Sequence, residues 1–370
     1  MKKYLHIILF IIFIPTVCNA QYYNRSSYKT KRHEISFGLG ASSCLTDLGG
    51  GEAPESSFFT GNTLSDRPIA RSFLFDLDVQ KTNFVADFSY LYYLKSKIAL
   101  RLSLTYSKVS GDDSYSGEFY RRNRALNFNT TIAECSGIIE LTLIPEKTGN
   151  KFNLKNKYGK SIGAKSPLGF GVYIFAGLGG FYYDPWGMDK FLNSDTINVG
   201  NSQKYRLREL HTEGQGFEDG PEQFSEKVTG QKYSTYKNLA ICVPLGFGIK
   251  KAFHSTAGIK FEASYRFTNT DYLDDVSDFY YDKDKLKEKM TDAFGAELAN
   301  RAYIMSGTQT GAILNSDDIT HTEPGMERGG PNYNDSYMFL SFSVYKKFTN
   351  TPKNMRIANS SSRRKIKASF

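Results

Sequence analysis

Apolar and polar residues alternate without a break between residues 259 and 267. The apolar row and the polar row are, in order, Ile259, Phe261, Ala263, Tyr265 and Phe267 against Lys260, Glu262, Ser264 and Arg266. Because successive side chains of a β-strand point to opposite faces, one face of this strand is apolar and the other is ionic. A transmembrane β-barrel turns the first face to lipid and the second to its lumen. The stretch 255–277, which ends in the acidic sequence TDYLDDVS, therefore predicts a membrane-spanning strand followed by a turn.

The same period of two recurs along the chain and predicts an all-β fold, an eight-stranded antiparallel transmembrane barrel over residues 34–348. The expected strands cover 34–42, 84–93, 98–106, 124–144, 167–182, 239–249, 255–277 and 337–348. The fourth is longer than the roughly 9 to 11 residues that cross a bilayer, so its first half is expected to rise above the membrane. Glycines are frequent in one row of the fifth and sixth strands, and an inward glycine row relieves crowding in a narrow barrel.

The first twenty residues have the parts of a secretory signal peptide. Two lysines precede the apolar stretch 5–14, and cleavage is expected after Ala20. Lipid attachment at Cys18 is the alternative, but Val17 is bulky where such signals carry a small residue. After this segment no apolar run approaches the roughly 20 residues of a spanning helix, so any spanning structure consists of strands.

The predicted connections alternate between short and long. Shorter links fall at 94–97, 145–166 and 250–254, and long ones at 43–83, 110–123, 184–237 and 270–335. Bacterial barrels have short periplasmic turns and long external loops. An outer-membrane barrel with both termini in the periplasm follows, with an N-terminal arm at 21–33 and a tail at 349–370 that is expected to be disordered on its own.

The inward row is expected to hold charges of both signs, Glu34, Asp87, Glu134, Glu140 and Glu262 with Arg101, Lys260 and Arg266. Such groups cannot stay unpaired at low dielectric, so they predict an ionic network that fills the lumen. Eight strands leave an interior just wide enough for side chains, which argues against a diffusion pore. Glu134 and Glu140 would suit a catalytic carboxylate pair, but we prefer the structural network.

Basic residues gather in the segments expected in the periplasm. The arm 21–33 has four bases and no acid, the turn 145–166 six bases and one acid, and the tail 349–370 six bases and no acid. Nucleic acid is not a partner in this compartment, whereas a periplasmic protein, acidic lipid or cell-wall polymer is. The residues expected to dock a partner are Lys147, Lys151, Lys155, Lys157, Lys160, Arg363, Arg364 and Lys365.

Familiar catalytic and cofactor motifs are absent, so we expect neither an enzyme nor a bound cofactor. There is no nucleophile elbow, phosphate-binding glycine loop or CxxC pair, and the five histidines lack ligand spacing. The odd set Cys44, Cys135 and Cys242 favours free thiols over a disulfide framework. Calcium binding by the acidic turn at 271–275 is an alternative to capping and cross-loop ion pairs, which we favour because the spacing is not that of a known calcium loop.

Five short motifs stand out along the chain. They are HEIxxG at 33–38, TDLG at 46–49, RNRxLxF at 122–128 before Glu134, TEGQG at 212–216 and TDYLDDVS at 270–277. Together they resemble the motifs of the PorG-type outer-membrane proteins of the type IX secretion system of Bacteroidota. The resemblance covers most of 33–277. Its most specific loop residues are Thr212, Glu213, Gly214, Gln215, Gly216, Thr270, Asp271, Tyr272, Leu273, Asp274 and Asp275.

The resemblance implies an eight-stranded barrel that associates with the periplasmic ring of the lipoprotein PorK and its partner PorN. Its role there would be noncatalytic anchoring during protein export. A small channel or a surface ligand-binding barrel is the alternative, with outer-membrane lipid as the surrounding partner in either case. Because the TDYLDDVS segment falls on the outer side by loop parity, its expected role is to hold the outer loops together.

Overall fold

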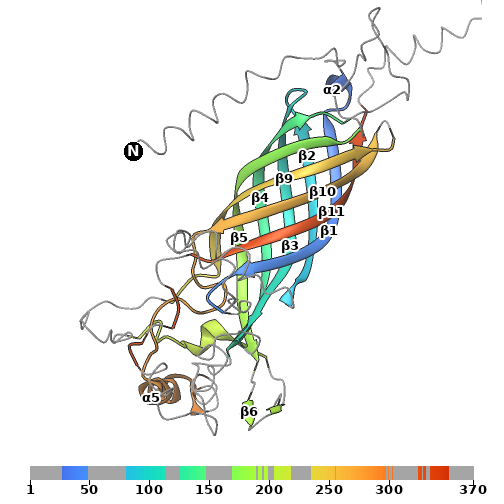
Figure 1. Cartoon of the computed structure of the whole chain (residues 1–370). Coiled ribbons are helices and arrows are strands. Elements are labelled where there is room, and N and C mark those ends of the chain that lie inside the picture. The colour runs from blue at the N-terminus through green and yellow to red at the C-terminus, as the bar shows by residue number, and fades with distance from the viewer. Residues whose placement is uncertain are drawn as a thin grey trace, which may run out of the picture.

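Eight long antiparallel strands form a closed barrel in the computed structural model (Figure 1). The structure describes residues 27–48, 81–113, 126–146, 169–188, 191–193, 196–198, 204–217, 235–254, 256–296, 299, 302, 324–326, 328–330 and 334–349. The barrel strands are β1 (His33–Leu45), β2 (Asn83–Tyr93), β3 (Ile98–Asp112), β4 (Asn127–Ile144), β5 (Gly171–Met188), β9 (Leu239–Ala252), β10 (Ala257–Thr268) and β11 (Ser336–Phe348).

The barrel closes where the first and last strands meet. The strand order is β4-β3-β2-β1-β11-β10-β9-β5, and β5 pairs in turn with β4. In the β1–β11 ladder His33 lies opposite Phe348 and Leu45 lies opposite Ser336. Every long strand is therefore hydrogen-bonded on both sides, as a bilayer requires of the backbone groups within it. The predicted all-β fold with eight antiparallel strands is confirmed.

Strand bounds differ from the predicted ones mainly at the ends. The third strand runs on to Asp112, the fifth covers Gly171–Met188, and the sixth long strand, β9, continues to Ala252. The strand predicted over 255–277 is β10, which ends at Thr268, so the acidic segment after it was wrongly included and has no strand structure. In β9 the period-two pattern is lost at Lys250 and Lys251, where both rows carry a lysine.

Shorter elements precede the first long strand or lie in the connections between long strands. These are α2 (Ser27–Thr30), β6 (Phe191–Asn193), β7 (Thr196–Asn198), β8 (Lys204–Arg206), the 3-10 helix η4 (Leu207–Leu210) and α5 (Lys283–Phe294). The Asp282 side chain caps α5 by accepting the N–H groups of Asp284 and Lys285, and the helix ends at Gly295, whose φ is 92°. No helix in the described ranges is long and apolar enough to cross a membrane.

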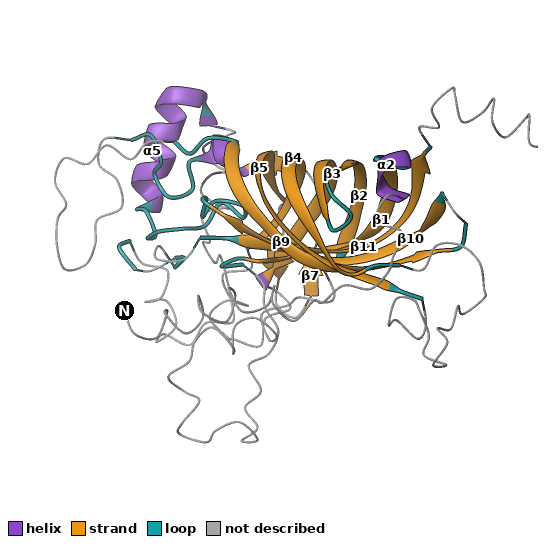
Figure 2. Cartoon of the chain, turned by 90° about the horizontal axis from the view of Figure 1, so that it is seen from above, coloured by secondary structure: helices purple, strands orange, loops and turns teal. Residues whose placement is uncertain are grey.

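The two ends of the barrel differ. We call the end with the β2–β3, β4–β5 and β9–β10 connections the turn end, and it also holds the start of β1 and the finish of β11. The opposite end, with the β1–β2, β3–β4, β5–β9 and β10–β11 connections, is the loop end. Figures 1 and 2 show α2 at the turn end and α5 at the loop end.

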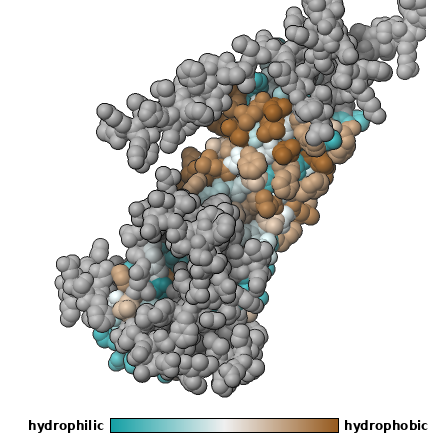
Figure 3. Space-filling model, viewed as in Figure 1, coloured by the Kyte–Doolittle hydropathy of each residue, from teal (hydrophilic) through white to brown (hydrophobic). Residues whose placement is uncertain are grey.

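The outer surface of the barrel is apolar. Outward side chains such as Phe37, Leu102 and Phe342 are 55%, 52% and 52% exposed, and Figure 3 shows apolar residues gathered over the strands. The inward neighbours in the same strands, such as Ser36 and Ser103, are buried. This inside-out arrangement is the one expected for a protein whose solvent is lipid.

Inward glycines make room for aromatic rings on the adjacent strands. Tyr173 lies opposite Gly248 and Phe175 opposite Gly246 in the β5–β9 ladder. A Cβ atom added to either glycine would lie 2.4 Å from the ring of its partner. The predicted inward glycine row of β9 is thus confirmed, but the inward row of β5 carries large aromatic residues between its glycines, which the prediction did not anticipate.

Candidate functional site

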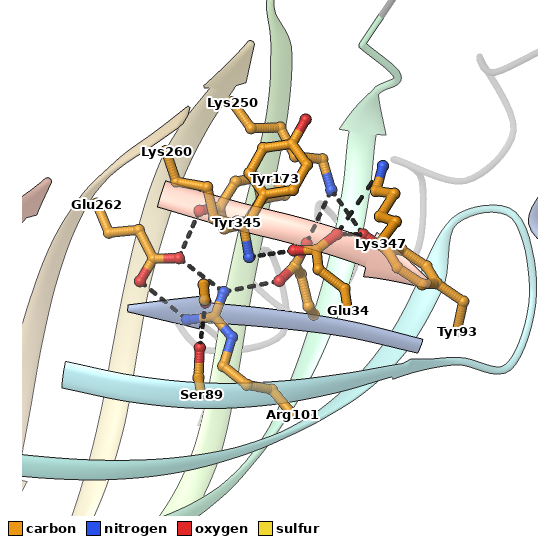
Figure 4. Close-up of polar contacts among 12 residues, drawn as sticks. Glu34, Ser89, Tyr93, Arg101, Tyr173, Lys250, Lys260, Glu262, Tyr345 and Lys347 are labelled. Atoms are coloured by element: carbon orange, nitrogen blue, oxygen red, sulfur yellow. Dashed lines mark hydrogen bonds and ion pairs between the residues drawn. The ribbon is translucent and has the colours of Figure 1, made fainter. Parts of the chain in front are cut away.

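The lumen is filled by the charged row that the sequence predicts. Arg101 lies at its centre, with Nη2 2.7 Å from Glu140 Oε2 and 2.8 Å from Glu262 Oε1. Lys260 Nζ is 2.5 Å from Glu34 Oε1, and Tyr173 donates a 2.5 Å hydrogen bond to Glu262 (Figure 4). We call this group the lumen plug, defined as Glu34, Tyr93, Arg101, Glu140, Glu146, Tyr173, Lys250, Lys260, Glu262, Tyr345 and Lys347.

Three charged members of the lumen plug were not predicted as lumen residues. Lys250 was assigned to a turn, but it lies in β9 with Nζ 3.2 Å from Glu140 Oε1. Glu146 was counted with the basic turn, yet it is buried and accepts hydrogen bonds from Tyr345 and Lys347. Lys347 Nζ also lies 3.8 Å from Glu34 Oε2. Continuing the inward row of β9 beyond Gly248 would have found Lys250.

A second, smaller group lies nearer the loop end of the lumen. Arg266 Nε is 3.2 Å from Glu134 Oε2, which also accepts a 3.0 Å hydrogen bond from Tyr337. Glu134 and Glu140 therefore have separate basic partners, as the structural network requires and a shared catalytic pair does not.

Asp87 departs from the expectation of complete pairing. Thr105 donates a 3.2 Å hydrogen bond to it, and no ion pair within the described residues involves it. Asp87 lines a lumen cavity of about 10 Å³ together with Arg101, Glu262 and Arg266. That volume is at the lower limit for one water molecule, so the cavity is no passage for solutes.

At the loop end, the motif segments from distant parts of the chain meet. Arg328 Nη1 donates to Thr212 Oγ1 at 3.1 Å, to Glu213 Oε1 at 2.8 Å and to the carbonyl oxygen of Asp275 at 2.8 Å. Thr212 and Tyr236 each donate a 2.6 Å hydrogen bond to the Asp275 carboxylate. The TEGQG and TDYLDDVS motifs are thus parts of one buried cluster.

Carboxylates of this cluster accept backbone N–H groups from their own loop and from other loops. Asp274 accepts from Val276 and from Leu48, each at 2.9 Å, which ties the TDLG motif to the TDYLDDVS motif. Glu213 accepts from Ser277 at 3.0 Å. Further bonds run from Leu273 N to Asp335 at 2.8 Å and from Gly330 N to Asp47 at 2.8 Å. We call the cluster the loop latch, defined as Asp47, Leu48, Thr212, Glu213, Gln215, Tyr236, Asp271, Leu273, Asp274, Asp275, Arg328 and Asp335.

Backbone conformation explains two motif glycines. Gly214 has φ of 75° and lies against the Tyr281 ring, so a Cβ there would approach Tyr281 Cδ2 to 2.5 Å. Gly216 has φ of 88°. Left-handed conformations of this kind favour glycine. Arg328, Asp335 and Tyr236 were missed by sequence reasoning because no period or motif marks them.

The loop latch holds more acid than base, and burial raises the pKa of Asp271, Asp274 and Asp335. Burial and the nearby Asp47 carboxylate raise the pKa of Asp274 well above its usual range. Burial and Asp274 do the same for the pKa of Asp335, and burial raises the pKa of Asp271 to about 8. Protons on these groups reduce the repulsion between them.

The described residues contain no group of three or more His, Cys, Asp or Glu side chains that could hold a metal ion. In the acidic turn, Asp274 caps backbone N–H groups and Asp275 accepts two hydroxyl groups. The observed contacts are thus those of the capping and cross-loop alternative. Cys44, Cys135 and Cys242 are free thiols.

The predicted docking residues, from Lys147 to Lys160 and from Arg363 to Lys365, lie outside the described residues. The same holds for the predicted signal peptide and for the tail from 350 onward. At the turn end the structure describes the start of the basic turn, Glu146, and the short N-terminal helix α2. The docking assignment stays a prediction.

No protein-family model matches the chain, and no curated protein does. Among solved structures it is similar to the N-terminal β-barrel domain of Pseudomonas aeruginosa OprF, at 8% identity over 86% of this chain and 99% of that one, with a TM-score of 0.25. It is also similar to Yersinia pestis Ail, at 7% identity, 86% and 99% coverage and a TM-score of 0.29. It is similar as well to Neisserial surface protein A, at 8% identity over 85% of this chain and 96% of that one, with a TM-score of 0.28. The strand order, closure and apolar outer face of the chain itself give it the fold of an eight-stranded outer-membrane β-barrel.

Proposed function

We propose that this chain is a noncatalytic outer-membrane barrel of the type IX secretion machinery that anchors a periplasmic ring of PorK-like and PorN-like proteins. The observation that carries the proposal is the filled lumen. With Arg101, Glu140 and Glu262 bonded across its centre, the barrel offers no route for solutes. Its function then resides in its two ends.

The turn end is the better candidate for the docking surface. The basic turn starts at Glu146, which is buried and held by Tyr345 and Lys347. The chain therefore enters the basic segment that follows Glu146 from a fixed point in the barrel. The basic N-terminal arm and tail leave from the same end, since His33 pairs with Phe348. Concentrated positive charge of this kind favours an acidic partner surface.

The loop latch supports the family resemblance in another way. The motif residues Glu213, Asp274 and Asp275 form hydrogen bonds with groups of other loops. A role in holding the loop end in one conformation accounts for them without a ligand. Docking is then left to the turn end.

Affinity purification of the full chain from gently solubilised native membranes tests the proposal. We expect PorK-like or PorN-like proteins to be recovered, and the triple variant K151E/K155E/K157E to lose most of this recovery at low salt. The difference between wild type and variant is expected to shrink as salt is raised, because salt screens the charges. The matched control is K237E/K285E/K287E, which reverses three exposed lysines at the loop end. Failure of the wild type to recover either protein would sink the proposal.

The channel alternative makes the opposite electrical prediction. A barrel whose lumen is closed by side chains passes no ions, so the purified chain is expected to show no steady conductance in planar lipid bilayers. Stable unitary currents from the wild type would favour the channel over the anchor.

A further inference from the structure

Two lysine pairs at the turn end are each divided between the inside and the outside of the barrel. Lys250 and Lys251 end β9, and Lys346 and Lys347 lie near the end of β11. Because side chains alternate along a strand, Lys250 and Lys347 point into the lumen. There Lys250 forms an ion pair with Glu140, and Lys347 forms one with Glu146. Lys251 and Lys346 point outward and are exposed.

The two outward lysines continue the lipid-facing rows of their strands. Lys251 lies between Ile249 and Phe253, which are 40% and 67% exposed, and Lys346 lies between Val344 and Phe348 in the same pattern. Their aliphatic stems therefore start at the rim of the apolar surface, from which a lysine extends its ammonium group to the headgroup layer.

The positions of the two lysines across the barrel wall suit one shared ligand. On β10, which lies between them, Ile259 pairs with Lys251 and Ala257 pairs with Lys346. Two strand spacings and a two-residue offset place the two Cα atoms roughly 12 Å apart. Two extended lysine side chains can span that separation and meet at one anion.

No protein carboxylate takes the place of that anion within the described residues. Neither Lys251 nor Lys346 takes part in an ion pair there, and the acids of the turn end, Glu34, Glu140 and Glu146, are buried in the lumen plug. The Lys251 ammonium group instead lies 4.5 Å from the centre of the Phe170 ring, a contact that keeps it at the rim.

We propose that Lys251 and Lys346 form a clamp for the phosphate of an anionic glycerophospholipid in the leaflet around the turn end. The phosphodiester lies between the two ammonium groups, and the acyl chains lie on the apolar rows that end at Phe253 and Phe348. The clamp depends on the barrel fold alone and is independent of the proposed ring-anchoring function.

Native mass spectrometry of the full mature chain, released from detergent with added phosphatidylglycerol or phosphatidylcholine, tests the clamp. The wild type is expected to retain phosphatidylglycerol in preference to phosphatidylcholine. The variant K251Q/K346Q is expected to lose about 30-fold in phosphatidylglycerol affinity, which corresponds to about 1 kcal/mol for each lysine. The variant K251R/K346R keeps both charges and is expected to keep most of the binding.

The matched control is K95Q/K97Q, which removes two exposed lysines from the β2–β3 turn at the same end. It is expected to leave phosphatidylglycerol retention within about twofold of the wild type, since about 1 kcal/mol per lysine applies only where a lysine contacts the headgroup. Unchanged retention in K251Q/K346Q overturns the clamp, and so does an equal loss in K95Q/K97Q, which would indicate diffuse attraction. Heat-modifiable migration on gels checks that each variant is folded.

Discussion

Arg101 donates two parallel hydrogen bonds to Glu262, at 2.9 Å from Nη1 and at 2.8 Å from Nη2. Arg101 lies on β3 and Glu262 on β10, which are not neighbours in the sheet, so the pair joins two separate walls of the barrel across its lumen. A guanidinium group matches a carboxylate in this two-bond geometry, which an ammonium group cannot reproduce.

Replacing Arg101 is expected to be costly. R101A leaves Glu140 and Glu262 buried with less compensation, and losing one partner of a buried ion pair costs about 3–5 kcal/mol. Urea unfolding in lipid vesicles, followed by the fluorescence of Trp186, measures the change. The control R206A removes a half-exposed arginine that pairs with Asp184 at 3.4 Å, and it is expected to cost about 1 kcal/mol or less. Equal effects of the two variants would contradict the central role of Arg101.

Asp87 and Glu140 are expected to respond differently to loss of charge. E140Q leaves Arg101 and Lys250 without a full partner, and we expect a loss of about 3 kcal/mol or more in the free energy of unfolding. In D87N the amide oxygen can still accept the hydrogen bond from Thr105, and no ion pair is broken. We therefore expect the free energy of unfolding to change by no more than about 1 kcal/mol. The same urea titration compares them, and a larger loss for D87N than for E140Q would show that the charge of Asp87 is needed.

The glycine–aromatic packing predicts a position-dependent cost for alanine. G248A places a methyl group 2.4 Å from the Tyr173 ring, and overpacking of this kind costs about 1–3 kcal/mol. G137A serves as the control, because Gly137 faces outward and its nearest contact to an added Cβ is 4.0 Å. Folding yield and unfolding free energy in vesicles would distinguish the two. Tolerance of G248A would mean that the Tyr173 ring can move.

The loop latch is expected to weaken as the pH rises. Burial raises the pKa of Asp271 from its usual 3.8 to about 8, so the ordered loop binds a proton that the disordered loop releases. The stabilisation is full below about pH 4 and is lost as the pH rises through about 8. Hydrogen exchange of the Leu273 and Val276 amides, corrected for the intrinsic rate, is expected to be faster at pH 9 than at pH 6.

The variant D271N provides the matched test of this pH dependence. An uncharged amide at residue 271 removes one titrating group, so the difference between pH 6 and pH 9 is expected to shrink. Amides in the middle of β10 serve as the internal reference, because the barrel wall does not contain these loop carboxyl groups. An unchanged pH response in D271N would assign the effect to another group.

Sequence alone was sufficient for the barrel because a period of two persists through each strand core, as in β10 from Ile259 to Phe267. Strand ends were less certain, since alternation has no contrast where both rows are polar. That limit hid Lys250 and Glu146 from the predicted lumen row. The signs of the other lumen charges were visible, but the partner of each charge depends on the stagger between strands, which periodicity does not determine.

The loop latch shows a different limit. Its motif residues Glu213 and Asp274 were selected by resemblance, and loop parity placed them on one side of the membrane. Their shared cluster depends on Arg328 and Asp335, which lie in long connections without any regular pattern. Loops about a hundred residues apart in the sequence come into contact because the closed barrel brings them to the same end. Local sequence patterns do not indicate such a contact.

Glu34 connects the beginning of the chain to its end. It lies on the first strand, and its basic partners, Lys260 and Lys347, belong to the last two strands. During membrane insertion the Glu34 carboxylate therefore has no counter-ion of its own until those strands arrive. A chain that ended before β10 and β11 would leave the Glu34 carboxylate without either of these ion-pair partners.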